Sequence, residues 1–471
     1  MLASRVYSVH QKSVLEEQLM PSLQSLLDQV ESATNEIVEL EQALVRIPSI
    51  NTGFMPTGGE TAVAEFIRDW LDEDGLSSEI LARDADRGNI ISVYPGDDND
   101  TRLMLMSHTD VVPVEDETKW NWDPFAAEIS EGRIYGRGAS DCKALLTSQL
   151  MAMAIMKRSG VRLDHGLRLV SGADEEHGGR WGFGWLADNH PDSLKSQFAV
   201  NEGGGTPVEM GNSLTYLLGT GEKGRMELHI TLRGESAHAS VPWTGVNASY
   251  KLSRALSAIE AYRPELDTSL EIFDHIGQFG IEEKPSPMNV DRIVAELDKT
   301  SPRLGSMLKA LSRMVLTPTM MSGGIKSNSV PEEIKLTCDI RTLPFQDEAY
   351  VRRQLDQTFD GIDGLEYEID YMSVPNSSEF ETELTDSIRK AQAAAIGRDD
   401  IQWIPAISNG FTDSRFTRNL GIVTYGFTGA HPDDDPMLSR AHGTDESVGI
   451  ASLISGTRSM LAIAYDLCSA R

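Results

Sequence analysis

The segment LMLMSHTDVV, residues 103–112, joins an apolar run to a cluster of polar side chains. The apolar run 103–107 predicts a short buried strand, which ends where His108-Thr109-Asp110 begins. Because side chains alternate along a strand, His108 and Asp110 fall on one face. In open α/β sheets, ligands bind at the carboxyl ends of the strands. The segment therefore predicts an α/β fold that carries its chemistry at a strand end.

Four further segments place polar side chains after a strand or in a tight turn. They are GRGASDCK (136–143), SGADEEHGG (171–179), NEGGG (201–205) and AHGTDE (441–446). Taken singly, each has a simple alternative as a capped or glycine-rich turn, and His108 alone could be a histidine in a loop hydrogen bond. Taken together, they supply two histidines and at least three carboxylates. Such mixed nitrogen and oxygen ligands favour zinc, cobalt or manganese over calcium or a thiolate-bound ion.

Composition narrows the class of protein. The chain has 471 residues, 40% of them hydrophobic, which is an ordinary globular mixture. Its 42 basic and 72 acidic residues give 42 − 72 = −30, a charge that disfavours nucleic-acid and anionic-membrane partners. Three scattered cysteines without a C-x-x-C motif fit a reducing compartment. With no apolar signal segment near the N-terminus and no run long enough to span a membrane, we expect a cytoplasmic protein.

The order of predicted elements indicates one domain inserted into another. Helices and short strands alternate up to about residue 219 and again from about residue 379, which predicts a sheet flanked by helices. The helices are predicted at 13–47, 61–72 and 143–157, the strands at 78–81, 89–94, 103–107, 167–170 and 198–200, and the returning elements at 379–396, 422–425 and from 446. We therefore predict a catalytic domain from residues 1–219 and 375–471.

The intervening residues 220–374 have a different pattern of predicted strands and helices. Strands at 226–232, 335–340 and 365–371 and helices at 247–262 and 348–359 predict a small antiparallel sheet with helices on one face. Two stretches that contain proline or glycine, 282–287 and 317–324, are predicted to interrupt it. The insertion is thus expected to be an α+β domain.

The order of these segments and the residues they contain resemble those of the M20 family of metallopeptidases and amidohydrolases, from about Glu39 to Ala464. The resemblance implies two bound divalent metals, zinc with cobalt or manganese as alternatives. His108, Asp141, Glu176, Glu202 and His442 are then the metal ligands, with Asp141 bridging both ions and followed by a cis peptide bond. The family often has aspartate where this chain has Glu202. Asp110 is implied as the carboxylate that orients His108, and Glu175 as the general base.

The resemblance also implies a function for the insertion, as a ferredoxin-like lid and dimerisation domain. In GESAHAS (234–240), His238 is then the residue that reaches the active site of the partner protomer. Asn328 and Arg341 are implied as contacts of the substrate carboxylate, although Ser329 stands where the family usually has valine. Lid closure would require hinges near Gly219 and Val374.

The expected function is hydrolysis of a peptide or N-acyl amino acid bond in a small substrate with a free carboxylate, by a metal-activated water. Two alternatives remain open: a metal-dependent binding protein without catalysis on the same fold, and a dinuclear aminopeptidase, whose class is expected to lack the inserted lid. A homodimer through the lid is implied by the resemblance alone.

Overall fold

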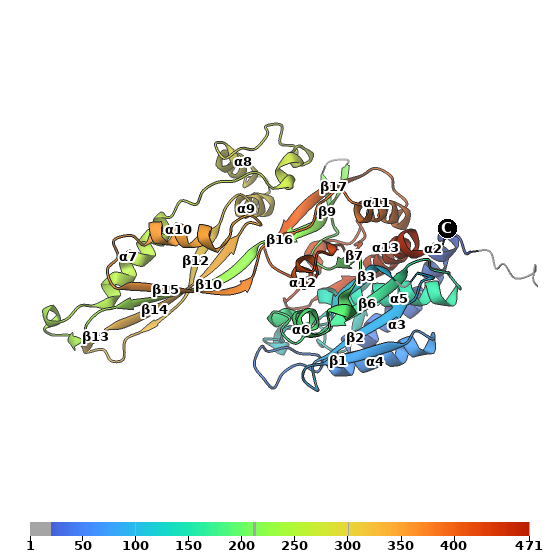
Figure 1. The fold of residues 1–471 in the computed structure, drawn as a ribbon, viewed down its shortest axis with the longest axis horizontal. Coiled ribbons are helices and arrows are strands. Elements are labelled where there is room, and N and C mark those ends of the chain that lie inside the picture. Colours follow the sequence, from blue (N-terminus) through green and yellow to red (C-terminus); the bar gives the residue numbers. More distant parts are fainter. Residues whose placement is uncertain (1–19, 99, 211–212, 300, 471) are drawn as a thin grey trace, which may run out of the picture.

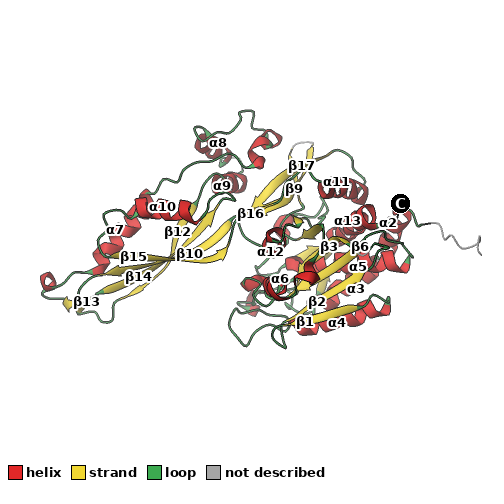
Figure 2. Cartoon of the chain, in the orientation of Figure 1, coloured by secondary structure: helices red, strands yellow, loops and turns green. Residues whose placement is uncertain are grey.

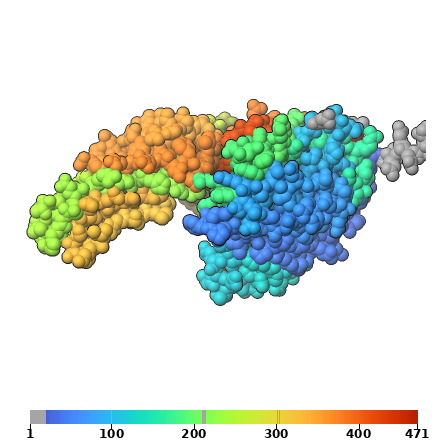
Figure 3. All heavy atoms as spheres, turned by 60° about the horizontal axis from the view of Figure 1, so that its bottom comes forward, coloured from blue at the N-terminus to red at the C-terminus, as the bar shows by residue number. Residues whose placement is uncertain are grey.

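The chain folds into two bodies, a larger one with a ten-stranded sheet and a smaller one with a four-stranded sheet (Figure 1). The computed structural model describes residues 20–98, 100–210, 213–299 and 301–470. The smaller body extends away from the larger one, so that the molecule is elongated (Figure 3). Residues 13–19 of the predicted first helix lie outside the described residues.

The larger sheet is mixed, and its central strands are parallel. Its main path runs β1-β2-β6-β3-β7-β18-β9-β16, with β8 and β17 also paired to β9. The strands span Ser78–Ala82 (β1), Gly88–Tyr94 (β2), Thr101–His108 (β3), Gly166–Gly172 (β6), Phe198–Asn201 (β7), Thr206–Met210 (β8), Ser213–Glu222 (β9), Asn376–Ser377 (β16), Ile401–Ser408 (β17) and Val423–Gly426 (β18). Strands β6, β3, β7 and β18 run parallel to one another, so their carboxyl ends meet at one edge.

Helices cover both faces of this sheet (Figure 2). Side chains alternate between the faces, so that Leu105 belongs to one apolar cluster and Met104 to the other. One face carries α2 (Leu23–Ser32), α3 (Thr34–Val45), α4 (Glu60–Glu73), α5 (Ala144–Arg158), α11 (Glu383–Ile396) and α13 (Ile450–Cys468); the other carries α6 (Phe183–Asn189) and α12 (Ser414–Asn419). Burial on both faces explains why the strands read as continuous apolar runs. The single helix predicted over 13–47 is two helices, which meet at Ala33.

The smaller body is the predicted antiparallel sheet, in the order β12-β14-β10-β15. Its strands are Gly224–Arg233 (β10), Val315–Gly323 (β12), Glu333–Thr342 (β14) and Leu365–Ser373 (β15), and helices α7 (Ala248–Ala261) and α10 (Glu348–Thr358) pack on one face. Strand β12 corrects the predicted interruption at 317–324. Proline is tolerated there because β12 is an edge strand, and its pairing with β14 shifts register between Pro318 and Met320.

A helical segment between α7 and β12 packs on the larger body. It contains two short helical turns, Glu271–Asp274 and Ile276–Phe279, followed by α8 (Val290–Leu297) and α9 (Pro302–Leu311). Its apolar side chains form one buried cluster with Ile404 and Ile407 of β17. The buried Lys223, between β9 and β10, donates hydrogen bonds to the carbonyls of Ala310 and Arg313 at 2.6 and 2.9 Å. A segment inserted in the smaller body is thus attached to the larger one.

Short strands complete the structure. The strands Glu128–Ser130 (β4), Arg133–Tyr135 (β5) and Ser447–Gly449 (β19) form a three-stranded sheet, and Ala237–His238 (β11) pairs with Ser329–Val330 (β13). None of the helices in the described part of the chain has both the length and the apolar character needed to cross a membrane.

Candidate metal centre

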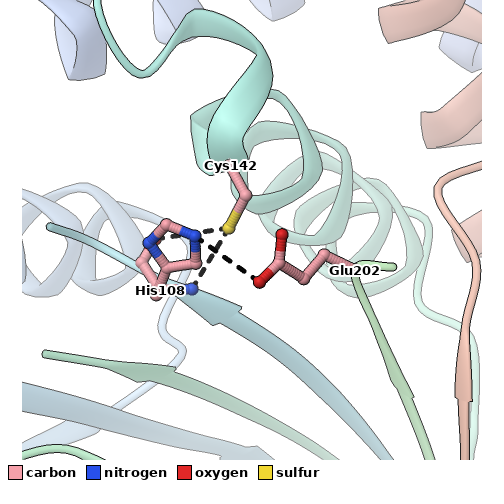
Figure 4. Close-up of side chains that lie close together, drawn as sticks. All are labelled: His108, Cys142 and Glu202. Atoms are coloured by element: carbon pink, nitrogen blue, oxygen red, sulfur yellow. Dashed lines mark hydrogen bonds and ion pairs between the residues drawn. The ribbon is translucent and has the colours of Figure 1, made fainter. Parts of the chain in front are cut away.

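The predicted ligands converge from separate elements at the carboxyl edge of the parallel strands. His108 ends β3, and the helical turn Glu175–His177 follows β6. Glu202 follows β7, Asp141 lies in the turn before α5, and His442 lies in the loop before β19. Figure 4 shows His108 and Glu202 pointing toward each other below the start of α5. The edge-of-sheet position expected from the sequence is where these residues meet.

Asp141 lies between the two histidines. Its Oδ1 is 3.1 Å from His108 Nε2, and its Oδ2 is 3.2 Å from His442 Nε2. Burial alone would raise the pKa of Asp141, but the hydrogen bonds and charges of both histidines outweigh burial and lower it. One carboxylate thus presents one oxygen to each imidazole, which is the arrangement a carboxylate needs in order to bridge two ions.

Each histidine also faces a second carboxylate. His442 Nε2 lies 3.0 Å from Glu176 Oε2, and His108 Nε2 lies 3.7 Å from Glu202 Oε1. The ligand atoms of His108, Asp141 and Glu176 lie within 4.8 Å of one another. The five predicted ligands therefore form two adjoining groups that share Asp141.

Asp110 holds both His108 and the turn that carries the glutamates. Its Oδ1 is 3.5 Å from His108 Nδ1, and its backbone carbonyl is 3.0 Å from the same nitrogen. Its carboxylate accepts hydrogen bonds from the amides of Glu175 and Glu176 and from the side chain of Asn51. A partner on the second ring nitrogen fixes the orientation of a histidine, leaving Nε2 to face the centre.

Glu175 lies beside the ligands and is buried, with 9% of its surface exposed. Burial raises the pKa of its carboxyl well above the usual range, and the charge of Glu202 adds to the rise. Burial likewise raises the pKa values of Glu202 and Glu176. A carboxyl that is not paired with either histidine and whose pKa is raised has a higher proton affinity than an ordinary glutamate, which suits a group that accepts a proton.

The donor set fits two divalent cations. Five carboxylates, those of Asp110, Asp141, Glu175, Glu176 and Glu202, crowd around two imidazoles at the end of one sheet. Such crowding is unfavourable unless positive charge compensates it, because buried like charges repel in a medium of low polarity. Imidazole nitrogen and carboxylate oxygen are the ligands that zinc accepts in open sites.

Cys142 completes a third group of close atoms that the sequence did not predict. Its Sγ lies within 4.8 Å of the ligand atoms of His108 and Glu202. Figure 4 shows the three side chains pointing toward one another. The sulfur accepts a hydrogen bond from the amide of His108 and contacts its carbonyl at 3.6 Å. Because burial raises the pKa of this thiol to about 12, Cys142 supports the end of β3 as a neutral group. The Asp141–Cys142 peptide bond is cis, as the resemblance implied.

Glu446 is a second unpredicted member of the site. Its side chain is fully buried and accepts hydrogen bonds from the amides of Gly138, Ser140 and Asp141, and it is paired with Arg137. It therefore shapes the turn that presents Asp141. The only signal in the sequence was its place in the AHGTDE segment.

The loops that carry the site contain non-glycine residues with a left-handed backbone conformation. Asp174, His442 and Asp445 have φ values of 66°, 63° and 58°. Non-glycine residues rarely adopt this conformation, and such strain concentrates at functional sites. Asp174 itself forms an ion pair with Arg87, and His177 is exposed at the end of the helical turn Glu175–His177.

The three predicted substrate contacts do not come together in this chain. Arg341, on β14, is near the larger body, because its Nη1 donates to the carbonyl of Asn409 at 3.0 Å. His238 and Asn328 lie in neighbouring segments, because His238 pairs with Ser329 and the amide of Ala239 donates a hydrogen bond to the Asn328 carbonyl. Strand β11, which contains His238, and strand β13, which directly follows Asn328, are at the far end of the smaller body, remote from the parallel sheet (Figure 1).

A cavity of about 500 Å³ opens onto the predicted ligands. Asp141 and Glu202 line one part of it, and Met307 of α9 lines another. The loop that precedes His442 contributes further lining residues. The cavity is large enough for a small-molecule substrate.

Comparison with known proteins identifies the family. The sequence pattern of peptidase family M20/M25/M40 matches residues 104–466. The chain belongs to this family. The membership of the M20 family that the motifs predicted is thus confirmed.

Curated relatives of the M20 chain carry several activities in their names. An uncharacterized metallohydrolase of Methanococcus maripaludis is 30% identical over 238 residues, or 46% of this chain and 54% of that protein. A probable succinyl-diaminopimelate desuccinylase of Staphylococcus aureus is 25% identical over 83% of this chain and 88% of its own. Rat aminoacylase-1A is 27% identical over 77% of this chain and 80% of its own. The M20 chain thus spans only about half the length of the first of these relatives.

Solved M20 structures share the fold. A metallo-carboxypeptidase from Sulfolobus solfataricus superposes with a TM-score of 0.70 at 20% identity, over 91% of this chain and 99% of its own. A dinuclear metal binding peptidase from Bacillus subtilis superposes with a TM-score of 0.55 at 15% identity, over 92% of this chain and 98% of its own. Aminopeptidase PepT from Bacillus cereus superposes with a TM-score of 0.64 at 16% identity, over 92% of this chain and 98% of its own. An aminopeptidase can therefore have this fold, so the inserted sheet does not separate the two classes as expected.

Proposed function

We propose that this M20 chain hydrolyses the amide bond of a small substrate with a free carboxylate, either a peptide or an N-acyl amino acid. The observation that carries the proposal is the position of Asp141 between His108 and His442, next to a buried glutamate that neither histidine holds. A protein that only binds metal has no use for such an acid.

Two metal ions would be held by residues already close together. His108, Glu202 and Asp141 would bind one ion, and His442, Glu176 and Asp141 the other, with zinc favoured and cobalt or manganese as alternatives. Divalent ions bound there would polarise the scissile carbonyl and bring the pKa of a coordinated water toward about 7.

Proton transfer, positioning of the ligands and binding of the substrate are assigned to different residues of the chain. Glu175 accepts a proton from the attacking water and returns it to the leaving nitrogen, which its raised pKa favours. Asp110 keeps His108 and the Glu175–His177 turn in place. Arg341 holds the free carboxylate of the substrate, because a guanidinium offers a planar pair of donors that lysine lacks.

The remaining substrate contacts are proposed to come from a second copy of the chain. His238 and Asn328 lie at the tip of the smaller body, far from the centre of their own chain (Figure 1). The edge strand β12 leaves Met320 and Met321 exposed, at 69% and 62% of their surface. A second β12 pairing there would cover this edge and form a homodimer, in which His238 of one protomer donates to the developing oxyanion in the site of the other.

The experiment combines metal analysis of the purified protein with a hydrolysis screen of dipeptides, tripeptides and N-acyl amino acids. We expect close to two zinc, cobalt or manganese ions per chain and release of free amine from substrates with a free carboxylate. Activity that instead requires a free amino terminus would assign the aminopeptidase class. Metal without turnover on the whole panel would assign a binding protein. We further propose a cytoplasmic location, supported by the three buried, unpaired cysteines among the described residues.

A further inference from the structure

A second pocket lies between the two bodies. Its volume is about 490 Å³, and its lining comes from α6 and α12 of the larger body and from Tyr371 and Met372 of β15 in the smaller one. The lining includes three arginines, Arg83, Arg180 and Arg415. The only acidic residue that lines it is Asp188.

The three arginines differ from most others in this acidic chain. The chain has 72 acidic and 42 basic residues. Most described arginines form an ion pair with an aspartate or a glutamate. Within the described residues, neither Arg83, Arg180 nor Arg415 has such a partner at 4.0 Å or less. Three guanidinium groups without an ion pair at that distance thus line the same pocket, although the charge of Arg415 also acts on the buried carboxylate of Asp413, where it partly offsets the rise in pKa that burial causes.

Arg415 is the most constrained of the three. Only 4% of its surface is exposed, and its guanidinium lies over the rings of Phe411 and Phe416, at 4.2 and 4.5 Å. Its Nη2 donates to the carbonyl of Gly178 at 2.8 Å, whereas its Nη1 is buried without a hydrogen-bond partner among the described residues. A buried charged donor without a partner is costly, and an acceptor would relieve that cost.

The other two arginines are positioned by one segment. Arg83 Nη1 donates to the carbonyl of Arg180 at 3.3 Å, and its guanidinium lies 5.3 Å from the centre of the Trp181 ring. No hydrogen bond or ion pair holds the exposed Arg180 side chain to a described residue. The planar donors of a guanidinium match the oxygens of a carboxylate or phosphate group.

We propose that this pocket binds an oxyanion, a carboxylate or phosphate group, at a place distinct from the metal centre. The pocket shares Gly178 with the turn that carries Glu175 and Glu176, since Gly178 N donates to the Glu175 carbonyl at 2.9 Å. An anion seated there contacts both bodies and the end of the catalytic turn. It belongs either to the substrate, as a second carboxylate, or to a separate small ion.

The test uses inorganic phosphate and the metal-loaded protein. Melting temperature and calorimetric titration are compared in phosphate and in sodium chloride of equal ionic strength. The variants are Arg83→Gln, Arg180→Gln and the double variant; both residues tolerate glutamine because neither has an ion pair to lose. The matched control is Arg254→Gln, an exposed arginine of α7 that lies outside the pocket.

We expect phosphate to raise the melting temperature of the wild type and of Arg254→Gln, and each pocket substitution to weaken phosphate binding about tenfold. Any phosphate that binds at the metal centre is common to all variants and cancels from the comparison. Equal phosphate binding in the wild type and the double variant would overturn the proposal, and so would no binding in either. This measurement needs no substrate, so its outcome is independent of the proposed function.

A second measurement distinguishes the source of the anion. If the anion is a second carboxylate of the substrate, Arg180→Gln raises KM for substrates with two carboxylates and leaves KM for those with one unchanged. If the anion is a separate ion, both KM values stay at the wild-type level while phosphate binding is lost.

Discussion

The carboxylate of Glu446 accepts a hydrogen bond from the backbone amide of Asp141 at 3.0 Å. The same side chain accepts from the amides of Gly138 and Ser140, so one buried acid from the segment after His442 shapes the whole turn that presents Asp141. Two parts of the chain about 300 residues apart are thereby fixed to each other. Because Asp141 is proposed to contact both metals, the geometry of the centre depends on this contact.

Replacing Glu446 should therefore weaken metal binding without removing a ligand. We expect Glu446→Gln to lower metal affinity by about 10–100-fold, the usual effect of losing a group that orients a ligand. Competition with a chelator measures this affinity. Glu128→Gln, at an exposed glutamate of β4, serves as the control and should bind like the wild type. Unchanged affinity in Glu446→Gln would separate this residue from the metal centre.

Glu175→Gln should separate metal binding from turnover. The amide cannot accept a proton, so we expect kcat to fall by about 10²–10⁴-fold while the metal content stays at the wild-type level. The neighbouring substitution Glu176→Gln is the control, and it should lose metal as well as activity. An active Glu175→Gln enzyme would refute the assignment of the base.

His238→Ala tests whether the site is shared between two chains. We expect this variant to lose about 10²–10³-fold in rate, because one donor to the oxyanion is gone. Mixed with Glu175→Gln, it should regain part of the activity, since a mixed dimer has one site in which both residues are present. Mixed dimers verified by mass but still inactive would count against sharing.

Stability should depend on pH through Lys223. Burial, then the charges of Arg341 and Arg313, lowers the pKa of Lys223 to about 7, whereas the unfolded chain keeps it near 10.4. Between these values the unfolded state binds more protons, so the contribution of Lys223 to stability rises from about pH 7 to about pH 10. In Lys223→Met, this part of the rise in melting temperature should disappear. The exposed Lys390→Met is the control; a slope as steep in Lys223→Met as in the wild type would contradict the assignment.

The sequence predicted which side chains converge better than it predicted the loops around them. His108, Glu175 and Glu202 follow strands whose carboxyl ends meet at one edge, so their convergence follows from strand order alone. Glu446 and Cys142 could not be found this way. Their contacts depend on the conformation of two loops, which includes a cis peptide bond and left-handed residues that no local pattern indicates.

The elements that were missed are explained by proline and by position in the sheet. Pro318 lies in the predicted interruption at 317–324, and no strand was predicted over β17, which contains Pro405. Each of these strands pairs with only one neighbour. An unpaired edge tolerates a residue without an amide proton. The strands of the smaller sheet with a regular alternation of buried and exposed side chains, such as β10, were predicted to within two residues at each end, because one of their faces is buried and the other is not.

The packing of the α8–α9 segment on β17 limits how the two bodies can move. Rotation about the strand crossings near Lys223 and Val374 alone would pull Ile404 out of its apolar cluster and break the hydrogen bonds from Lys223 to α9. A segment that travels with the larger body requires bending at both of its ends, in the irregular residues 262–270 that join it to α7 and in residues 312–314 that join α9 to β12. A hinge at the two strand crossings alone is therefore not sufficient, because the connections within the insertion have to bend with it, one of them some forty residues along the chain from Lys223.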